Sequence, residues 1–321
     1  MKKKVDEYSA WMKAYEDRIR RVAKIDSLDK AEAWIAEVSN DAGVRKMQRE
    51  VRQIVNEARA FSRFWIKENL ERSYNRGTTI SRLAIEQAGL KLGKIPRTYL
   101  AASSINYGIE QMSGDMEIAL GSITKKFNRM IRGMSVQIKG AKAAERMLTA
   151  ESLERIATRS AVQSYVSGEG YKTTAQSIMD GFRKEIGAGL VRVVGPSGKP
   201  RNYQLKDYSQ MVARTRMAEI HSEGTKNVLF ENGMDFVEVT AYGTDCEICA
   251  EHEGLIYSIS GEGELDNANF EGALTDDAEP PFHPNCTHVL MPYIPSEDEV
   301  ESDPTGTFEA LADEEVAQEG A

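Results

Sequence analysis

Apolar residues in the first 185 positions recur at alternating spacings of three and four, the pattern of helices that bury one face. The first such stripe comprises Tyr8, Met12, Tyr15, Ile19 and Val22. Asp26-Ser27 interrupts it, and a second stripe occupies residues 28–38. The pattern therefore predicts two amphipathic helices at the start of the chain.

A third stripe keeps a seven-residue repeat three times, which is typical of long helices that pack along one another. It comprises Met47, Val51, Ile54, Ala58, Phe61 and Trp65. After it, Gly77-Thr78-Thr79 predicts a break and a new helix cap, and residues 93–96 predict another stop and start.

A fourth stripe covers residues 105–134, where Gly108, Gly114 and Gly121 count against one unbroken helix. A last long helix is expected at residues 143–166, with a shorter segment reaching Glu185. We therefore expect residues 1–185 to be a mainly α-helical region with long amphipathic helices.

The pattern changes after residue 185 to short runs that alternate like strands. Residues 190–194 and 201–205 flank a Gly- and Pro-rich turn and predict a β-hairpin. Asp207 can cap a helix that Asn232-Gly233 closes. Further short strands are expected at residues 236–240, 255–259 and 289–291. Residues 186–295 are therefore expected to form a small α+β domain.

Charge is divided unevenly along the chain, whose net charge is −9. Residues 1–200 carry 36 Lys and Arg against 23 Asp and Glu, and residues 201–321 carry 5 against 27. Such asymmetry concerns partners and solubility rather than fold. Solvated helix faces are the simplest interpretation of the basic half, and contact with nucleic acid or an acidic protein surface is the alternative. The acidic tail, residues 296–321, is expected to be mostly disordered.

Membrane insertion and secretion are not expected from this sequence. No run of 18 apolar residues occurs. The basic start lacks the apolar core of a signal peptide, which indicates folding in a reducing cytoplasm.

Candidate chemistry concentrates between Cys246 and His288, where all three cysteines and three of the four histidines lie. Cys246 and Cys249 form a C-x-x-C knuckle, and His283, Cys286 and His288 follow within six residues of one another. Thiolate and neutral imidazole suit a tetrahedral zinc ion. We predict a structural zinc ion (Zn2+) held by the three cysteines and one of the two histidines, with His283 slightly favoured over His288.

Other interpretations of this cluster are a reactive or redox thiol, or no shared site. A disulfide is the weaker alternative because three cysteines leave one unpaired. His252 is expected to support the site or face solvent. Four protein ligands would leave no position for water, which argues against catalysis by the metal. Ordering the polar loop at residues 261–279 costs conformational entropy, and a metal ion that joins the two ends of the loop would offset this cost.

An enzymatic alternative is a zinc nucleobase deaminase, because His221-Ser222-Glu223 precedes the C-x-x-C knuckle as in the H-x-E…P-C-x-x-C motif. Asp245 replaces the motif's proline, the His221 segment falls within a predicted helix, and Cys286 would be left unexplained. A zinc nuclease or toxin lacks a second cluster of carboxylates and histidines. We therefore expect no enzyme.

Several short motifs between residues 201 and 294 occur in one order. They are Tyr203-Gln204-Leu205-Lys206-Asp207-Tyr208, Gly233-Met234-Asp235-Phe236-Val237-Glu238-Val239, Cys246-Glu247-Ile248-Cys249, Glu253-Gly254-Leu255-Ile256-Tyr257 and Pro281-Phe282-His283-Pro284-Asn285-Cys286-Thr287-His288. In these motifs the chain resembles phage minor capsid and head morphogenesis proteins of the minor capsid protein 2 type, related to Mu F-like head proteins. Some relatives carry cysteine where this chain has His288, which implies that this position can meet the metal.

The resemblance implies a structural, low-copy component of a tailed-phage or prophage head. Its implied partners are the portal protein and/or the major capsid protein, with non-specific contact between the basic region and packaged DNA. The implied location is the virion, after assembly in the host bacterial cytoplasm, and the protein is expected to be able to leave with the DNA.

Overall fold

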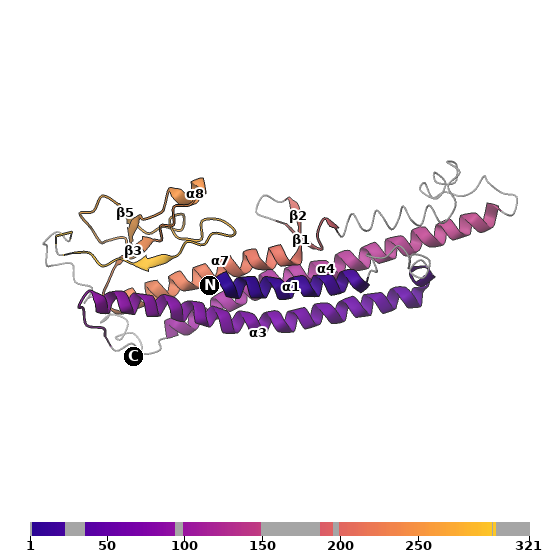
Figure 1. Ribbon diagram of the computed structural model, residues 1–321, viewed down its shortest axis with the longest axis horizontal. Coiled ribbons are helices and arrows are strands. Elements are labelled where there is room, and N and C mark those ends of the chain that lie inside the picture. Colours follow the sequence, from indigo (N-terminus) through magenta and orange to yellow (C-terminus); the bar gives the residue numbers. More distant parts are fainter. Residues whose placement is uncertain are drawn as a thin grey trace, which may run out of the picture. The chain divides into compact units, whose positions relative to one another are not determined.

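The computed structural model describes residues 2–22, 36–93, 99–148, 187–194, 199–296 and 298–299. Within them the helices are α1 (Lys2–Val22), α3 (Asp41–Gln87), α4 (Tyr99–Leu148), α7 (Leu205–Glu231) and α8 (Glu247–Ala250). The strands are β1 (Val191–Val194), β2 (Pro200–Tyr203), β3 (Phe236–Val239), β4 (Ile256–Ser258), β5 (Phe270–Ala273) and β6 (Leu290–Pro292). A mainly helical N-terminal region and a smaller strand-containing C-terminal part confirm the predicted fold class (Figure 1).

Several predicted segments lie outside the described residues. They are most of the helix at 28–38, the part of the 143–166 helix beyond residue 148, the segment reaching Glu185 with the boundary after it, and almost all of the acidic tail. Among the described helices, none combines the length and the low polarity that crossing a membrane requires.

The chain forms two compact units, each assembled from stretches far apart in sequence. One unit contains Ile66–Met112 and Val212–Ala321, and we call it the sheet unit. The other contains Lys2–Trp65 and Ser113–Met211, and we call it the bundle unit. Helices α3, α4 and α7 each contribute residues to both units.

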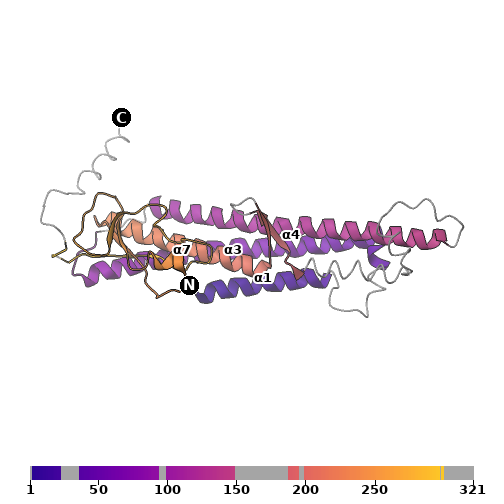
Figure 2. The same ribbon diagram turned by 90° about the horizontal axis from the view of Figure 1, so that it is seen from above.

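The core of the bundle unit forms where the apolar stripes of α1 and α3 meet. The Tyr8 ring stacks on Trp65 with 4.3 Å between ring centroids, and its hydroxyl lies 2.6 Å from that of Ser62. In the third predicted apolar stripe, which lies on α3, the residues from Met47 to Ala58 are buried. Within this unit α3 and α4 run side by side in both views (Figure 2), antiparallel to each other.

The predicted hairpin is present in the bundle unit, where β1 pairs antiparallel with β2. Buried Lys126 of α4 donates to the carbonyl of Gly189, just before β1, at 2.6 Å. The buried carboxylate of Glu16 accepts the backbone N–H of Leu205, the first residue of α7, at 2.6 Å. A carboxylate at a helix N-terminus satisfies a free N–H and complements the helix dipole.

The sheet unit contains a four-stranded sheet in the order β5-β4-β3-β6. Strand β3 pairs antiparallel with β4 and β6, and β4 pairs parallel with β5. Its core combines α3, α7 and sheet residues: Ile85, Val228, Leu229, Val237, Val239, Tyr257, Ala278 and Leu290. The backbone N–H of Leu290 donates to the hydroxyl of Ser222, which attaches β6 to α7.

The predicted break at Gly77-Thr78-Thr79 was wrong, because α3 continues unbroken to Gln87. A Cβ atom at Gly77 would lie 2.1 Å from the carbonyl oxygen of His221, and one at Gly224 would lie 2.4 Å from that of Tyr74. These two glycines therefore allow α3 and α7 to approach closely. Helix α4 is likewise unbroken, and its Gly108 makes room for Ile220.

The segment at residues 261–279 was predicted to be a loop, but it contains β5. Phe270 pairs with Ile256 of β4, and its ring packs edge-on against Phe236 at 5.8 Å. The strand is short, and Gly272 adopts a φ of 88°. With one aromatic side chain and no full alternation, its sequence carries little strand signal.

Candidate metal centre

The first half of the candidate centre is a turn between β3 and β4. The backbone N–H of Cys246 donates to the hydroxyl of Thr244 at 3.2 Å, and the carbonyl of Cys246 accepts from Ala250 at 2.9 Å. Cys246 thus precedes the single turn of α8, and Cys249 lies buried within that turn. This geometry directs both thiols of the C-x-x-C knuckle to one side of the turn.

A second turn before β6 supplies the other half. The N–H of Cys286 donates to the carbonyl of His283 at 3.0 Å, and Asn285 between them has a φ of 73°. Asparagine tolerates this left-handed conformation better than most residues. The turn buries Cys286 and places His283 and His288 on either side of it in sequence.

The five predicted ligand residues come together. The Sγ atoms of Cys249 and Cys286 are 3.8 Å apart, and Cys286 Sγ lies 3.5 Å from Nδ1 of His288. Nε2 of His283 lies 3.0 Å from Cys249 Sγ and 3.3 Å from Cys246 Sγ. The five residues make two overlapping groups that share Cys249, and this cluster can hold a metal ion.

The donor set fits zinc in both chemistry and spacing. A tetrahedral ion with Zn–S bonds of about 2.3 Å and Zn–N bonds of about 2.0 Å separates sulfurs by about 3.8 Å, and sulfur from nitrogen by about 3.5 Å. The distances from Cys286 Sγ to Cys249 Sγ and to Nδ1 of His288 match these two separations. The contacts of His283 with sulfur are a few tenths of an ångström shorter.

The electrostatics of the thiols also favour a cation. Burial, together with the neighbouring Cys286 and Cys246 thiols, raises the pKa of Cys249 to about 12. A thiolate is therefore unfavourable among these residues alone. A divalent cation would supply the opposite charge that a thiolate cluster needs, so metal binding and loss of the thiol protons are linked.

His288 is held by the partly buried carboxylate of Glu253, which carries no sequence signal of a role in the site. Its Nε2 lies 2.7 Å from Oε1 of Glu253, which also accepts the backbone N–H groups of Tyr242 and Gly243. These bonds lower the pKa of Glu253 to about 2. A carboxylate on one imidazole nitrogen fixes the ring so that the other nitrogen can face a metal.

His283 is oriented in an equivalent way by the backbone. Its Nδ1 lies 2.8 Å from the carbonyl oxygen of Pro284, which leaves Nε2 facing the two knuckle cysteines. Each histidine therefore offers one nitrogen to the cysteines and uses the other in a hydrogen bond. The local geometry therefore allows both His283 and His288 to coordinate a metal ion.

His252 and His221 belong to neither group of candidate ligands among the described residues. The His252 ring stacks on Phe282 at 4.2 Å between centroids, and its Nδ1 lies 3.4 Å from the Tyr257 hydroxyl. His221 is buried within α7, as predicted, and burial together with the charge of Arg76 lowers its pKa to about 4.

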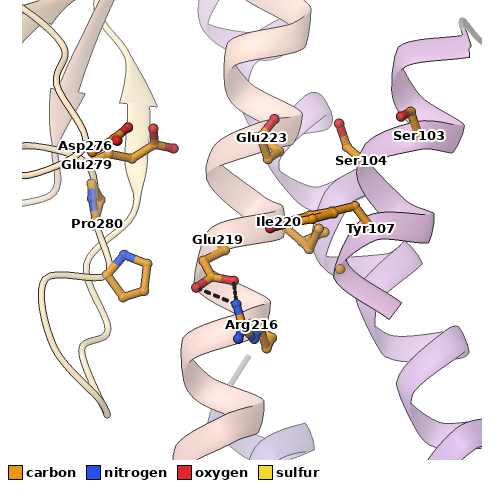
Figure 3. Close-up of a pocket in the computed structure, with 12 residues that line it drawn as sticks. Ser103, Ser104, Tyr107, Arg216, Glu219, Ile220, Glu223, Asp276, Glu279 and Pro280 are labelled. Carbon is orange, nitrogen blue, oxygen red and sulfur yellow. Dashed lines mark hydrogen bonds and ion pairs between the residues drawn. The ribbon is translucent and has the colours of Figure 1, made fainter. Parts of the chain in front are cut away.

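A separate cleft of about 560 Å³ lies between α4, α7 and the segment before the second turn (Figure 3). Glu223 of the His221-Ser222-Glu223 segment lines this cleft. Lys226 bridges Glu223 and Glu279, with 2.7 Å to each carboxylate. None of the five candidate metal ligands lines the cleft.

These features define a mainly helical protein whose C-terminal part carries a Cys/His cluster that can bind a metal. A family model for phage minor capsid protein 2 matches residues 5–320, nearly the whole chain. The chain therefore belongs to the phage minor capsid protein 2 family, which confirms the resemblance seen in the sequence and implies a place in the virion. Searches of curated proteins and of solved structures found no match.

Proposed function

We propose that this protein is a structural minor head protein that acts in head assembly at or near the portal of a tailed phage or prophage. The family match over residues 5–320 carries this proposal, because it covers the helical region as well as the metal centre. The proposed partners are the portal protein and/or the major capsid protein, encountered in the host cytoplasm during assembly. Exit with the DNA is part of the proposal.

The proposed metal is structural zinc, bound by Cys246, Cys249, Cys286 and either His283 or His288. Two turns separated by more than 30 residues meet at these side chains, so one ion would join the segments before β4 and before β6. With four protein ligands, zinc closes its coordination sphere and contributes to folding rather than to catalysis.

The enzymatic alternative is a zinc-dependent enzyme acting on DNA, of the deaminase or the nuclease and toxin type. A deaminase site would need His221 beside the knuckle cysteines and Glu223 free to transfer protons. The cluster groups the cysteines with His283 and His288 instead, and Glu223 is paired with Lys226. These contacts support the structural proposal over the enzymatic one.

The metal proposal is tested by zinc analysis of the purified protein and its Cys286→Ser variant. We expect about one zinc per wild-type chain, because the cluster offers one tetrahedral site. The variant should lose zinc and the order of the sheet, whereas Glu223→Gln should keep both. A wild type that is folded without metal would refute structural zinc, and deamination that depends on Glu223 would support the enzyme.

The head proposal is tested by locating the protein in assembled particles. Procapsids, full heads and heads emptied of DNA are purified, and the copy number of the protein is measured in each by quantitative mass spectrometry. We expect a low copy number in procapsids and full heads, and depletion in emptied heads. Absence from procapsids and full heads would refute the head role. Retention in emptied heads would refute only the proposal that the protein leaves with the DNA.

A further inference from the structure

Helix α3 carries a line of arginines within the bundle unit. Arg45, Arg49 and Arg52 are exposed and follow one another at spacings of four and three, so they share one face of the helix. Glu50 and Glu57 lie on a different face, and Glu57 pairs with Arg18 of α1 at 2.6 Å. Of the acids near the arginine face, Glu57 is therefore engaged by Arg18, and Asp41, one turn before Arg45, is engaged by Lys139 of α4.

Helix α4 repeats this arrangement. Lys125, Arg129 and Arg132 are exposed and have the same spacings of four and three. Residues 118–144 contain no Asp or Glu at all. The line on α4 is therefore basic without interruption.

Two ion pairs bring the two lines alongside each other. Asp41 of α3 pairs with Lys139 of α4 at 2.6 Å, and Arg59 pairs with Glu117 at 2.9 Å. Between these pairs the two helices are antiparallel neighbours, as both views show (Figures 1 and 2). Successive residues of an α-helix are rotated by about 100° about the helix axis. The three arginines of α3 are therefore rotated by no more than about 80° from Asp41 and Arg59, and all three are exposed to solvent.

We call these six residues the basic seam: Arg45, Arg49, Arg52, Lys125, Arg129 and Arg132. None of them forms an ion pair with another described residue. Other bases nearby are neutralised, such as Arg18 by Glu57 and Arg59 by Glu117. Within the described residues, the seam therefore places six cations without an ion pair on adjacent faces of α3 and α4.

We propose that the basic seam binds the phosphate backbone of double-stranded DNA. This inference rests on the proposed function and specifies the surface through which the protein contacts DNA. The basic line on each helix spans about 10 Å, which corresponds to about three base pairs of duplex. Arginine and lysine on a rigid helix surface contact phosphates without reading sequence.

The surface composition favours DNA over an acidic protein partner. In the described part of the chain, no large exposed apolar side chain lies between Arg45 and Arg63 of α3, and on α4 the exposed Ile118 and Val136 lie seven residues before and four residues after the basic line. The buried core of a protein interface is rich in aromatic residues and poor in charge. Between Ile118 and Val136, and along Arg45–Arg52, the seam has the opposite composition, which matches a solvated contact with a phosphate backbone.

The inference is tested with the full chain and a 30-base-pair duplex of mixed sequence, with binding followed by fluorescence anisotropy at several salt concentrations. The seam variant replaces Arg45, Arg49 and Arg52 with Gln. The matched control replaces Arg82, Lys91 and Lys206, three exposed bases elsewhere, with the same loss of charge. Circular dichroism verifies that both variants keep their helices.

We expect the seam variant to bind DNA at least tenfold more weakly than the wild type, while the affinity of the control changes much less. The salt dependence should also weaken, by about 0.9 in log–log slope for each phosphate that the variant no longer neutralises. No binding by the wild type, or equal weakening in both variants, would overturn the inference. A seam variant that keeps its DNA affinity but no longer self-associates in ultracentrifugation would also overturn the inference. It would show that the seam binds the acidic C-terminal half of a second copy of the chain.

Incorporation into heads separates this inference from the head role. A seam variant that enters heads normally but no longer binds DNA supports both. A wild-type protein that enters heads without binding DNA leaves the head role intact and overturns the inference alone. Absence of the wild type from heads overturns the head role, whatever its affinity for DNA.

Discussion

At the scale of single residues, the sequence spacing did not determine whether His283 or His288 is the fourth metal ligand. The structure shows how the surroundings of the two histidines differ. His288 is buried and held by Glu253, whereas His283 is partly exposed and held by one backbone carbonyl. The Glu253 contact was not predictable from a ligand motif, because a supporting carboxylate has no fixed sequence distance from the histidine it orients.

Parallel substitution of the two histidines identifies the fourth ligand. We expect one of His283→Gln and His288→Gln to lose zinc as fully as Cys286→Ser, because a tetrahedral site that loses a ligand binds weakly. The other variant should keep zinc, as should the control His252→Gln. Zinc content and zinc affinity are measured for each variant. Retention of full affinity by both histidine variants would contradict a Cys3His site.

His221 predicts a pH dependence of stability that is independent of the cluster. Its pKa falls from an ordinary 6.5 to about 4 in the folded protein. Between these values the unfolded chain binds more protons than the folded chain, so stability falls as the pH falls from 6.5 towards 4. The full effect is about 3 kcal/mol of unfolding free energy.

The measurement compares urea unfolding of the wild type and His221→Gln from pH 7 to pH 4. The difference between the two isolates His221, because acid release of a metal affects both proteins alike. We expect the wild type to lose stability more steeply below pH 6.5. Parallel curves for the two proteins would show that His221 does not titrate as its burial requires.

At the scale of elements, periodic apolar stripes were sufficient to predict the long helices, because burial of one face determines where a helix packs. The same reasoning misplaced the ends of α3, since Gly77 was interpreted through its low helix propensity. Its role depends on the carbonyl of His221, which is 144 residues away in sequence. A contact of this kind leaves no local signal.

Glycine substitutions test the close approach of α3 to α7. Gly77→Ala should lower the free energy of unfolding by about 1–3 kcal/mol, because its Cβ would overlap the His221 carbonyl oxygen. Gly114→Ala in α4 is the matched control, since a Cβ there meets no atom within 4 Å. The control should stabilise the protein by about 0.5–1 kcal/mol.

Chemical denaturation of both variants gives these free energies directly. If Gly77→Ala is as stable as Gly114→Ala, the two helices are not packed at this position. Loss of helix in the circular dichroism spectrum of Gly77→Ala at low temperature would instead indicate that residue 77 lies at a helix end.

At the scale of the whole molecule, the sequence predicted the helical region, the α+β character of the C-terminal part and all five cluster residues. It did not predict that each compact unit interleaves distant stretches of chain. Ile85 of α3 belongs to the same core as Val237 and Leu290 of the sheet. The proposed boundary at residues 185–186 follows a change in pattern, whereas core membership follows contacts that no local pattern encodes.

The division into units predicts that metal removal acts locally. Trp11 and Trp65 fall within the bundle unit, whereas the metal centre belongs to the sheet unit. A chelator that strips the ion should speed amide exchange in β3, β4 and β6, because binding energy and folding energy are one quantity at such a site. Tryptophan fluorescence should stay unchanged under the same conditions.

Hydrogen exchange by mass spectrometry and fluorescence, recorded on the same chelated sample, test this local effect. Addition of zinc should restore protection of the sheet strands, and addition of magnesium, which prefers oxygen ligands, should not. Unchanged exchange after verified loss of the ion would mean that the sheet folds without it. Simultaneous loss of tryptophan fluorescence and sheet protection would mean that the two units unfold together, in which case the metal stabilises the whole chain.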